Sequence, residues 1–209
     1  MLDGLSLTRV AMHDLVARHV TLRGTVLDLG AGEASTYRPY LGGAAARYLR
    51  VDAAPGTNPD YVVDLDRDAL PIDAGSIDVV IAFNLLEHLY HHELVLGEAH
   101  RVLRPQGTLH VWVPFLIGYH PSPEDYFRYT EPALRRKLEA AGFGEITIRP
   151  VGGRFTAAAN LALSGIPTAP VRALVAGVAV LLDHLYYRVA RSAQRDGFPL
   201  GYLASATRT

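Results

Sequence analysis

Short apolar runs alternate, over most of the chain, with segments whose apolar residues recur every three or four positions. The apolar runs predict strands at residues 25–29, 48–51, 61–63, 77–83, 108–113 and 145–151. The helical spacing predicts helices at residues 7–20, 34–41, 86–103 and 131–141. This alternation predicts an α/β fold with a Rossmann-like, doubly wound and mostly parallel sheet.

The last part of the chain departs from this alternation. Residues 155–164 and 171–195 are predicted to form an inserted helical pair before a final strand at residues 200–207. The second helix carries an apolar stripe that can be interpreted as packing on the domain core, as a dimer face or substrate lid, or as a membrane-surface helix. Its most apolar stretch, residues 173–182, is about half of the roughly twenty residues that a spanning helix needs, so no segment is expected to cross a membrane.

The composition narrows the classes of partner. The 209 residues carry a formal net charge of −1, so the chain lacks the basic balance typical of nucleic-acid binding, and no nucleic acid is expected as a partner. There is no cysteine, which excludes disulfides, thiolate catalysis and cysteine-ligated metals. Charged residues interrupt the start of the chain, so it is not predicted to be a secretory signal, and we expect a cytoplasmic protein.

A glycine-containing turn directly follows the first predicted strand, at Gly30, Ala31 and Gly32. Glycines there let a ligand approach the backbone, and the turn lies at the carboxyl edge of the sheet, where such folds bind ligands. A dinucleotide site would carry a third glycine where Ser35 stands, which disfavours NAD. Asp28 would repel a pyrophosphate but could attract, directly or through water, the ammonium group of a methionine moiety. The turn therefore favours a cationic ligand.

Acidic residues stand at the ends of the next two predicted strands. Asp52 lies about 20 residues after the glycine turn, where a carboxylate can accept hydrogen bonds from both hydroxyls of a ribose. Asp64 and Leu65 offer a carboxylate and a backbone amide to an adenine edge, with Asp66 as the alternative acid. Ala53 and Leu65 are candidate apolar walls for the adenine ring.

Four stretches carry a resemblance to a known family: VLDLGAGEAS, YLRVD, VDLDRDALPIDAGSIDVVIAFNLLEHL and EAHRVLRPQGTLHVWVPF. They cover most of residues 25–115, and the chain resembles the class I S-adenosylmethionine-dependent methyltransferases of the small, single-domain, type 11-like kind. It departs from the family pattern at Ala34, where glycine is common. The resemblance implies a seven-stranded sheet whose last, antiparallel strand, residues 200–207, inserts beside residues 108–113.

The resemblance also implies a cofactor, S-adenosyl-L-methionine. Phe83 and Asn84 would approach its methionine end, and residues 66–70 would lie near its adenine. Glu87 and His88 match the family's Glu-His pair, and His88 could face the reacting centre. The implied activity is methyl transfer by in-line displacement to a small-molecule or lipid-linked acceptor, with oxygen, nitrogen and carbon left open as the acceptor atom.

A segment rich in polar aromatic residues follows the fifth predicted strand and should overhang the same crevice. His120 is the candidate general base because its ordinary pKa lies near neutrality. Tyr126 and Tyr129 are candidate positioning hydroxyls, and Arg128 is a candidate clamp for an anionic substrate. The alternative is structural: Asp125 would pair with Arg128, and the tyrosines would pack.

His88, His91 and His92 also invite a metal interpretation, since His88 and His92 are spaced to share a helical face. We nevertheless expect no metal site. The HExxH order is missing, no third ligand is evident, and methyl transfer from a sulfonium can proceed without a Lewis acid.

We expect a single methyltransferase domain over residues 1–209: an N-terminal helix (1–24), a cofactor-binding core (25–151), a helical insertion (152–197) and a final strand (198–209). A homodimer and a peripheral membrane contact through residues 171–195 are the expected further associations. Two other functions stay open. One is a non-catalytic partner or sensor protein that binds S-adenosylmethionine, and the other is a nicotinamide-dependent reductase.

Overall fold

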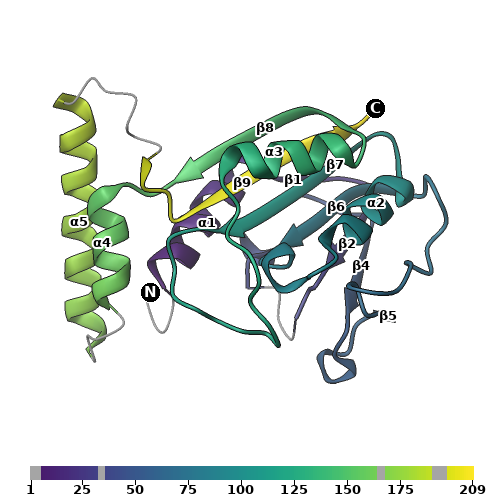
Figure 1. The fold of residues 1–209 in the computed structure, drawn as a ribbon, viewed down its shortest axis with the longest axis horizontal. Helices are drawn as coiled ribbons and strands as arrows, with labels where there is room; N and C mark the ends of the chain where they lie inside the picture. Colours follow the sequence, from purple (N-terminus) through teal and green to yellow (C-terminus); the bar gives the residue numbers. More distant parts are fainter. Residues whose placement is uncertain (1–5, 33–35, 164–167, 190–196) are drawn as a thin grey trace.

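A seven-stranded sheet organises the molecule (Figure 1), seen here in a computed structural model that describes residues 6–32, 36–163, 168–189 and 197–209. Its strands stand in the order β5-β4-β2-β6-β7-β9-β8. Their bounds are β2 Thr25–Leu29, β4 Arg47–Asp52, β5 Tyr61–Val62, β6 Ile77–Phe83, β7 Leu103–Pro114, β8 Phe143–Val151 and β9 Gly201–Arg208. Strand β9 lies between β7 and β8 and is antiparallel to both, while β5, β4, β2, β6 and β7 are parallel. The predicted fold class and the predicted insertion of the last strand are confirmed.

Helices cover both faces of this sheet. The bounds are α1 Leu7–His19, α2 His92–Val102 and α3 Glu131–Ala140, with short 3-10 turns η1 Arg38–Tyr40, η2 Pro55–Thr57 and η3 Leu86–His88. Two short strands, β1 Thr21–Leu22 and β3 Gly42–Gly43, pair in parallel beside the main sheet. The Ser6 hydroxyl accepts a hydrogen bond from the Arg9 amide and caps α1, and the Thr130 hydroxyl caps α3 in the same way through the Ala133 amide.

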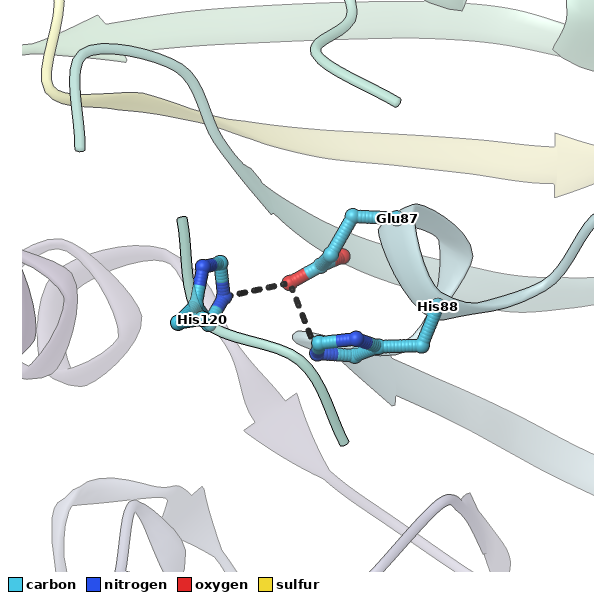
Figure 2. Close-up of side chains that lie close together, drawn as sticks. All are labelled: Glu87, His88 and His120. Carbon is cyan, nitrogen blue, oxygen red and sulfur yellow. Dashed lines mark ion pairs between the residues drawn. The ribbon is translucent and has the colours of Figure 1, made fainter. Parts of the chain in front are cut away.

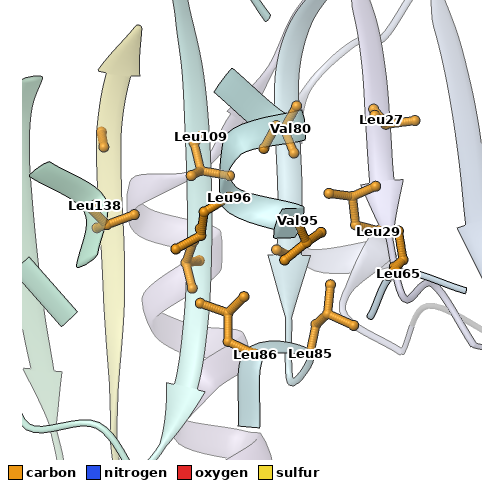
Figure 3. Close-up of a cluster of buried hydrophobic side chains, with 14 of the residues drawn as sticks. Leu27, Leu29, Leu65, Val80, Leu85, Leu86, Val95, Leu96, Leu109 and Leu138 are labelled. Atoms are coloured by element: carbon orange, nitrogen blue, oxygen red, sulfur yellow. The ribbon is translucent and has the colours of Figure 1, made fainter. Parts of the chain in front are cut away.

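Apolar side chains form a layer on each face of the sheet. Figure 3 shows one layer, where Val95 and Leu96 of α2 and Leu138 of α3 lie over Leu29 and Leu109 of the strands. The other layer packs α1 on the sheet through a second cluster: Met12, Val16, Val26, Phe83 and Trp112. All seven residues of β6 are buried, which explains the continuous apolar run in the sequence.

Two predicted helices differ from the observed elements. The expected helix at residues 86–103 is divided into η3 and α2 because Leu89 adopts an extended backbone between them. The expected helix at 34–41 contributes only the turn η1, which holds Pro39 near its start. Residues 33–35, with Ala34 and Ser35, lie outside the described part. Strand β7 begins at Leu103, earlier than predicted, and its pairing with β6 shifts register between Ile77 and Val79.

Helices α4 Arg154–Leu163 and α5 Ala169–Val189 form a hairpin that stands beside the sheet at the end of β8 (Figure 1). The Asp183 carboxylate of α5 accepts hydrogen bonds from the Phe155 and Thr156 amides and the Thr156 hydroxyl, which ties α5 to the start of α4. The predicted helical pair is confirmed where the structure describes it; residue 164 and residues 190–195 fall outside. Within the described ranges, Pro170–Val189 is long and apolar enough to cross a membrane by length and composition. Residues 173–182, which the sequence marks as the most apolar stretch, form only the middle of this longer apolar helix.

Candidate active site

A cavity of about 1010 Å³ lies at the carboxyl ends of the parallel strands and reaches the helical hairpin. Gly30, Gly32, Phe83 and Asn84 line its inner end. His88, Trp112 and the segment around His120 line its middle. Its outer end is lined by α1 and α5 residues: Leu7, Arg9, Met12, Arg172, Ala173, Ala176, Gly177 and Val180. One space therefore connects the predicted cofactor turn with the predicted insertion.

The glycine turn has the backbone that the sequence predicts. Gly30 and Gly32 both adopt positive φ angles, +68° and +63°, which side chains with a Cβ rarely tolerate. The Gly30 and Ala31 amides donate to the Val51 carbonyl, so the turn is fixed to the end of β4. A Cβ on Gly32 would meet no described atom within 4 Å, so this face of the turn is open to a ligand.

Asp28 does not lie where a ligand in the cavity can reach it directly. Its side chain is 0% exposed, and its two oxygens accept hydrogen bonds from the Tyr37 hydroxyl at 2.6 Å and the Tyr48 hydroxyl at 2.7 Å. Direct contact with an ammonium group does not fit this geometry. The carboxylate instead orients two tyrosines, of which Tyr37 lines the cavity.

Asp52 lies at the end of β4, beside the glycine turn as predicted. One carboxylate oxygen accepts a hydrogen bond from the Gly32 amide at 2.8 Å and the other from the Ala54 amide at 2.9 Å. Each oxygen keeps a further lone pair for a ligand hydroxyl, so binding to a ribose stays a prediction that the geometry permits. Ala53 follows in an exposed bend and is accessible as an apolar wall.

The predicted adenine side is only partly accessible. Asp64 accepts a hydrogen bond from the Asp66 amide, and Asp66 accepts one from the His91 amide. Leu65 packs in the core beside Leu29 (Figure 3), so its side chain does not serve as a wall for an adenine ring. Its backbone amide stays a predicted contact.

Phe83 and Asn84 reach the cavity from the end of β6, as the family resemblance implies. The Phe83 ring meets the Tyr37 ring edge to face with centroids 4.9 Å apart. Asn84 has a positive φ of 50°, and its amide donates to the Trp112 carbonyl on the neighbouring strand. This turn directs η3, and with it Glu87 and His88, along the cavity wall.

Three polar side chains converge beside the cavity (Figure 2): Glu87 and His88 from η3, and His120 from the loop after β7. The Glu87 Oε1 atom lies 3.7 Å from His88 Nε2 and 3.8 Å from His120 Nε2. Glu87 is 0% exposed, and neither of its carboxylate oxygens has a hydrogen-bond partner. The Glu87 carboxylate, followed by Asp125, raises the pKa of the His120 imidazole against the opposing effect of partial burial.

Arg128 and Tyr126 make contacts within the protein. The Arg128 guanidinium holds Asp125 through both terminal nitrogens, and this pairing keeps the pKa of Asp125 far below its usual range. This is the contact that the structural alternative for Arg128 describes, and its role as a clamp stays a prediction. The Tyr126 ring is 46% exposed and lies against the Tyr90 ring, outside the cavity lining. Tyr129 is buried and donates to the Leu86 carbonyl.

His88, His91 and His92, the histidines that the sequence suggests for a metal, do not form one cluster in the structure. His92 is buried against the Phe127 and Tyr129 rings, and burial lowers its pKa. His91 is exposed beside Tyr90. The division of the predicted helix between η3 and α2 separates the His88 and His92 faces, whereas His120 arrives next to His88 from the other side.

Sequence reasoning missed three features of the cavity. It gave no role to Glu87 beyond the family match, and it did not place Arg9 or Arg172 near the site. The Glu-His pair was a visible signal for Glu87, but its lack of partners follows from tertiary packing alone. Nothing in the local sequence could have shown that α1 and α5 each contribute an arginine to the lining of one cavity.

Comparisons with known proteins relate the chain to methyltransferases. Residues 27–111 match the model of a family described as a methyltransferase domain. The chain is 36% identical over 104 residues to a probable S-adenosylmethionine-dependent methyltransferase of Mycolicibacterium smegmatis, covering 47% of this chain and 37% of that protein. It is 29% identical over 171 residues to a probable S-adenosylmethionine-dependent methyltransferase of Mycobacterium tuberculosis, covering 72% of this chain and 58% of that protein.

The fold also matches a solved S-adenosylmethionine-dependent methyltransferase of Thermotoga maritima, described as a possible histamine N-methyltransferase. The TM-score is 0.61 at 13% identity, covering 97% of this chain and 92% of that one. This likeness shows the fold alone. The chain spans between about a third and three fifths of the length of the two curated relatives that it matches.

Proposed function

Since residues 27–111 match the model of a family described as a methyltransferase domain, we propose that this protein is a class I S-adenosylmethionine-dependent methyltransferase. Its acceptor would be hydrophobic and lipid-linked. The cavity that connects the glycine turn to the apolar helix α5 is the observation that carries the proposal. An acceptor that enters beside α5 meets the inner end of the cavity where the cofactor would lie.

The residues of the turn fit the cofactor. When bound, S-adenosyl-L-methionine supplies an activated methyl group on a sulfonium. The open face of Gly32 admits the ligand close to the backbone, and the Asp52 carboxylate retains acceptor capacity for the ribose hydroxyls. Phe83 and Asn84 line the same cavity as His88 and His120 and would hold the methionine end of the cofactor beside them.

The polar cluster beside the cavity would handle the acceptor atom. The acceptor must lose its proton where it is a hydroxyl or an ammonium group. The His120 imidazole, held between Glu87 and Asp125, is the side chain that would take this proton, with His88 beside it. The apolar lining around these groups would exclude water from the transfer.

The cavity lining favours an anionic and partly apolar acceptor. Arg9 and Arg172 belong to this lining, and a guanidinium group can bind a phosphate or carboxylate group of the acceptor. Ala173, Ala176 and Val180 of α5 continue the lining with apolar surface. A lipid with an acidic head group fits this lining, because the arginines would bind the head group and the apolar residues of α5 would contact the hydrocarbon.

We propose that α5 meets a membrane surface lengthwise and does not cross it. Leu174, Val178, Leu181 and Leu185 of α5 are exposed. The Asp183 carboxylate on the same helix is fully engaged by the start of α4. A spanning α5 would carry this buried carboxylate and the attached polar end of α4 into the hydrocarbon, which is costly. Surface docking exposes the cavity mouth to lipids and leaves these contacts intact.

Two measurements on the purified chain test this function. Calorimetry with S-adenosylhomocysteine should detect one site, and Asp52→Ala should weaken it while Asp60→Ala, beyond the turn, should not. Methyl-labelled S-adenosylmethionine incubated with a total lipid extract should transfer label to the organic phase. Binding without any labelled product from lipid or aqueous extracts would favour a sensor protein. Failure to bind the thioether would refute the function.

A further inference from the structure

We propose that Glu87, His88 and His120 bind a divalent transition-metal cation such as Zn²⁺, in a site that holds the acceptor atom for methyl transfer. Only the role in transfer rests on the proposed function, because metal binding itself follows from the side-chain cluster. Such a site differs from the expectation of no metal, which considered His88, His91 and His92 and lacked a third ligand. The third ligand, His120, comes from a loop far along the chain.

The three groups are spaced for a single ion (Figure 2). One atom from each side chain lies within 4.8 Å of the other two, and Glu87 Oε1 is 3.7 Å and 3.8 Å from the two Nε2 atoms. Ligands of tetrahedral zinc, each about 2.1 Å from the ion, stand about 3.4 Å apart. The two glutamate–histidine distances need to shorten by only a few tenths of an ångström, and rotation of the two imidazoles would bring their nitrogens together from within 4.8 Å.

The charge contacts of Glu87 among the described residues are with His88 and His120, so its charge is balanced either by a protonated imidazole or by a bound cation. Its carboxylate is completely buried and has no hydrogen bond on either oxygen. A buried carboxylate without partners is destabilising unless it is paired or coordinates a metal. Asp125, the other acid of the cluster, is already paired with Arg128. One negative charge is therefore left facing the two Nε2 atoms.

The outer contacts of both histidines have the pattern of metal ligands. His88 Nδ1 lies 2.5 Å from the Glu124 carbonyl oxygen. His120 Nδ1 lies 3.2 Å from the Gly118 carbonyl oxygen and 3.3 Å from the Asp125 carboxylate, and the Arg128 nitrogen at 3.4 Å is held by that same carboxylate. With the proton on Nδ1 of each ring, donated to these acceptors, the Nε2 lone pairs would face Glu87 and a bound cation. Metal-bound histidines are oriented by outer carbonyl and carboxylate partners in this way.

The ligand set indicates both the type of metal and its use. Two imidazoles with one carboxylate suit zinc or iron(II), cobalt(II) and nickel(II), whereas magnesium and calcium prefer oxygen ligands. Three protein ligands leave a coordination position free, and His88 and His120 both line the cavity. An acceptor hydroxyl bound there would lose its proton to solvent more readily, and His120 would then serve as a metal ligand in place of the base. Its oxygen would then form the bond to the methyl carbon while the carbon–sulfur bond breaks and its electron pair stays on sulfur.

Metal binding is measured on the purified full-length chain after treatment with chelator. Titration with Co²⁺, followed by visible absorption, and with Zn²⁺, followed by calorimetry, should each show one equivalent bound, and Mg²⁺ should not compete. His120→Ala and Glu87→Gln should each weaken Co²⁺ binding by more than about 100-fold, since even changes in outer partners cost 10–100-fold. His91→Ala is the matched control, an exposed neighbouring histidine outside the cluster, and should bind Co²⁺ as the wild type does.

S-adenosylhomocysteine binding, measured on the same samples, separates the two proposals and shows that each variant is folded. Loss of Co²⁺ binding with retained thioether binding in His120→Ala supports the metal site, even where Glu87→Gln does not fold. Absence of Co²⁺ and Zn²⁺ binding in the wild type, or an equal loss in His91→Ala, overturns it and leaves His120 as a base. Co²⁺ binding without thioether binding overturns the methyltransferase proposal and leaves the metal site standing.

Discussion

Strand β6 and helix α5 are both rich in apolar residues, yet β6 is fully buried whereas much of α5 is exposed. Every residue of β6 is buried between two layers of helices. Helix α5 exposes Leu174, Leu181, Leu185 and Val189, and α4 and the cavity cover its other side. Apolar burial in the sheet therefore stabilises the fold, whereas the apolar surface of α5 is available for association. Composition alone does not separate these two uses, because both segments consist mostly of apolar residues.

The largest expected effect lies in the sheet. Leu109→Ala on β7, where the side chain is 0% exposed, should lower the free energy of unfolding by about 2–5 kcal/mol, because it leaves a cavity in the core. Leu174→Ala on α5, where the side chain is 68% exposed, should change it by less than about 0.5 kcal/mol. Chemical denaturation of both variants measures the difference. Equal losses would remove the distinction between the two regions.

The contact between α5 and the start of α4 depends on Asp183. Asp183→Ala removes an acceptor used by two amides and a hydroxyl at the start of α4, and should destabilise the hairpin by about 2 kcal/mol. Hydrogen exchange of residues 154–163 should accelerate while the β6 amides stay protected. Asp14→Ala, an exposed acid on α1, is the control. A uniform acceleration over the sheet would show that the hairpin and the sheet unfold as one unit.

The sheet should also respond to pH through His110. Burial, followed by Arg149 and Arg23, lowers the pKa of His110 on β7 to about 4. The unfolded chain binds this proton near pH 6.5, so the stability that neutral His110 allows is present above pH 6.5 and is lost as the pH falls toward 4. Wild-type stability should drop between pH 7 and pH 5 by about 2 kcal/mol more than that of His110→Gln. Parallel pH curves in urea unfolding would contradict this assignment.

The smallest effect on free energy is expected at the surface of α5. The double substitution Leu174→Ser and Leu181→Ser should weaken binding to vesicles of anionic phospholipid about tenfold, which corresponds to about 1.4 kcal/mol of lost apolar contact. Thermal unfolding in the absence of lipid should be unchanged. Tyr90→Ser, an exposed aromatic outside the hairpin, should bind vesicles normally. Undiminished binding by the double variant would leave the apolar face of α5 without a membrane role.

Much of the fold could be predicted because its signals are local. The alternation of apolar runs and helical spacing predicted the parallel strands. The glycine turn and Asp52 predicted which end of the sheet the cofactor would occupy. The differences came where local signals compete with tertiary contacts. Leu89 interrupts a helix that its apolar spacing favours, and Arg128 pairs with Asp125 although either could have faced a ligand.

The sequence by itself determined the alternation of strands and helices, the open glycine turn and the family resemblance, because each depends on residues close together in the chain. Only the tertiary structure decided that His120 meets Glu87 and His88, that tyrosine hydroxyls enclose Asp28, and that α5 presents its apolar side outward. The physical reason is that burial, and the charge a buried group must balance, are set by which distant segments come together. No periodicity within one segment carries that information.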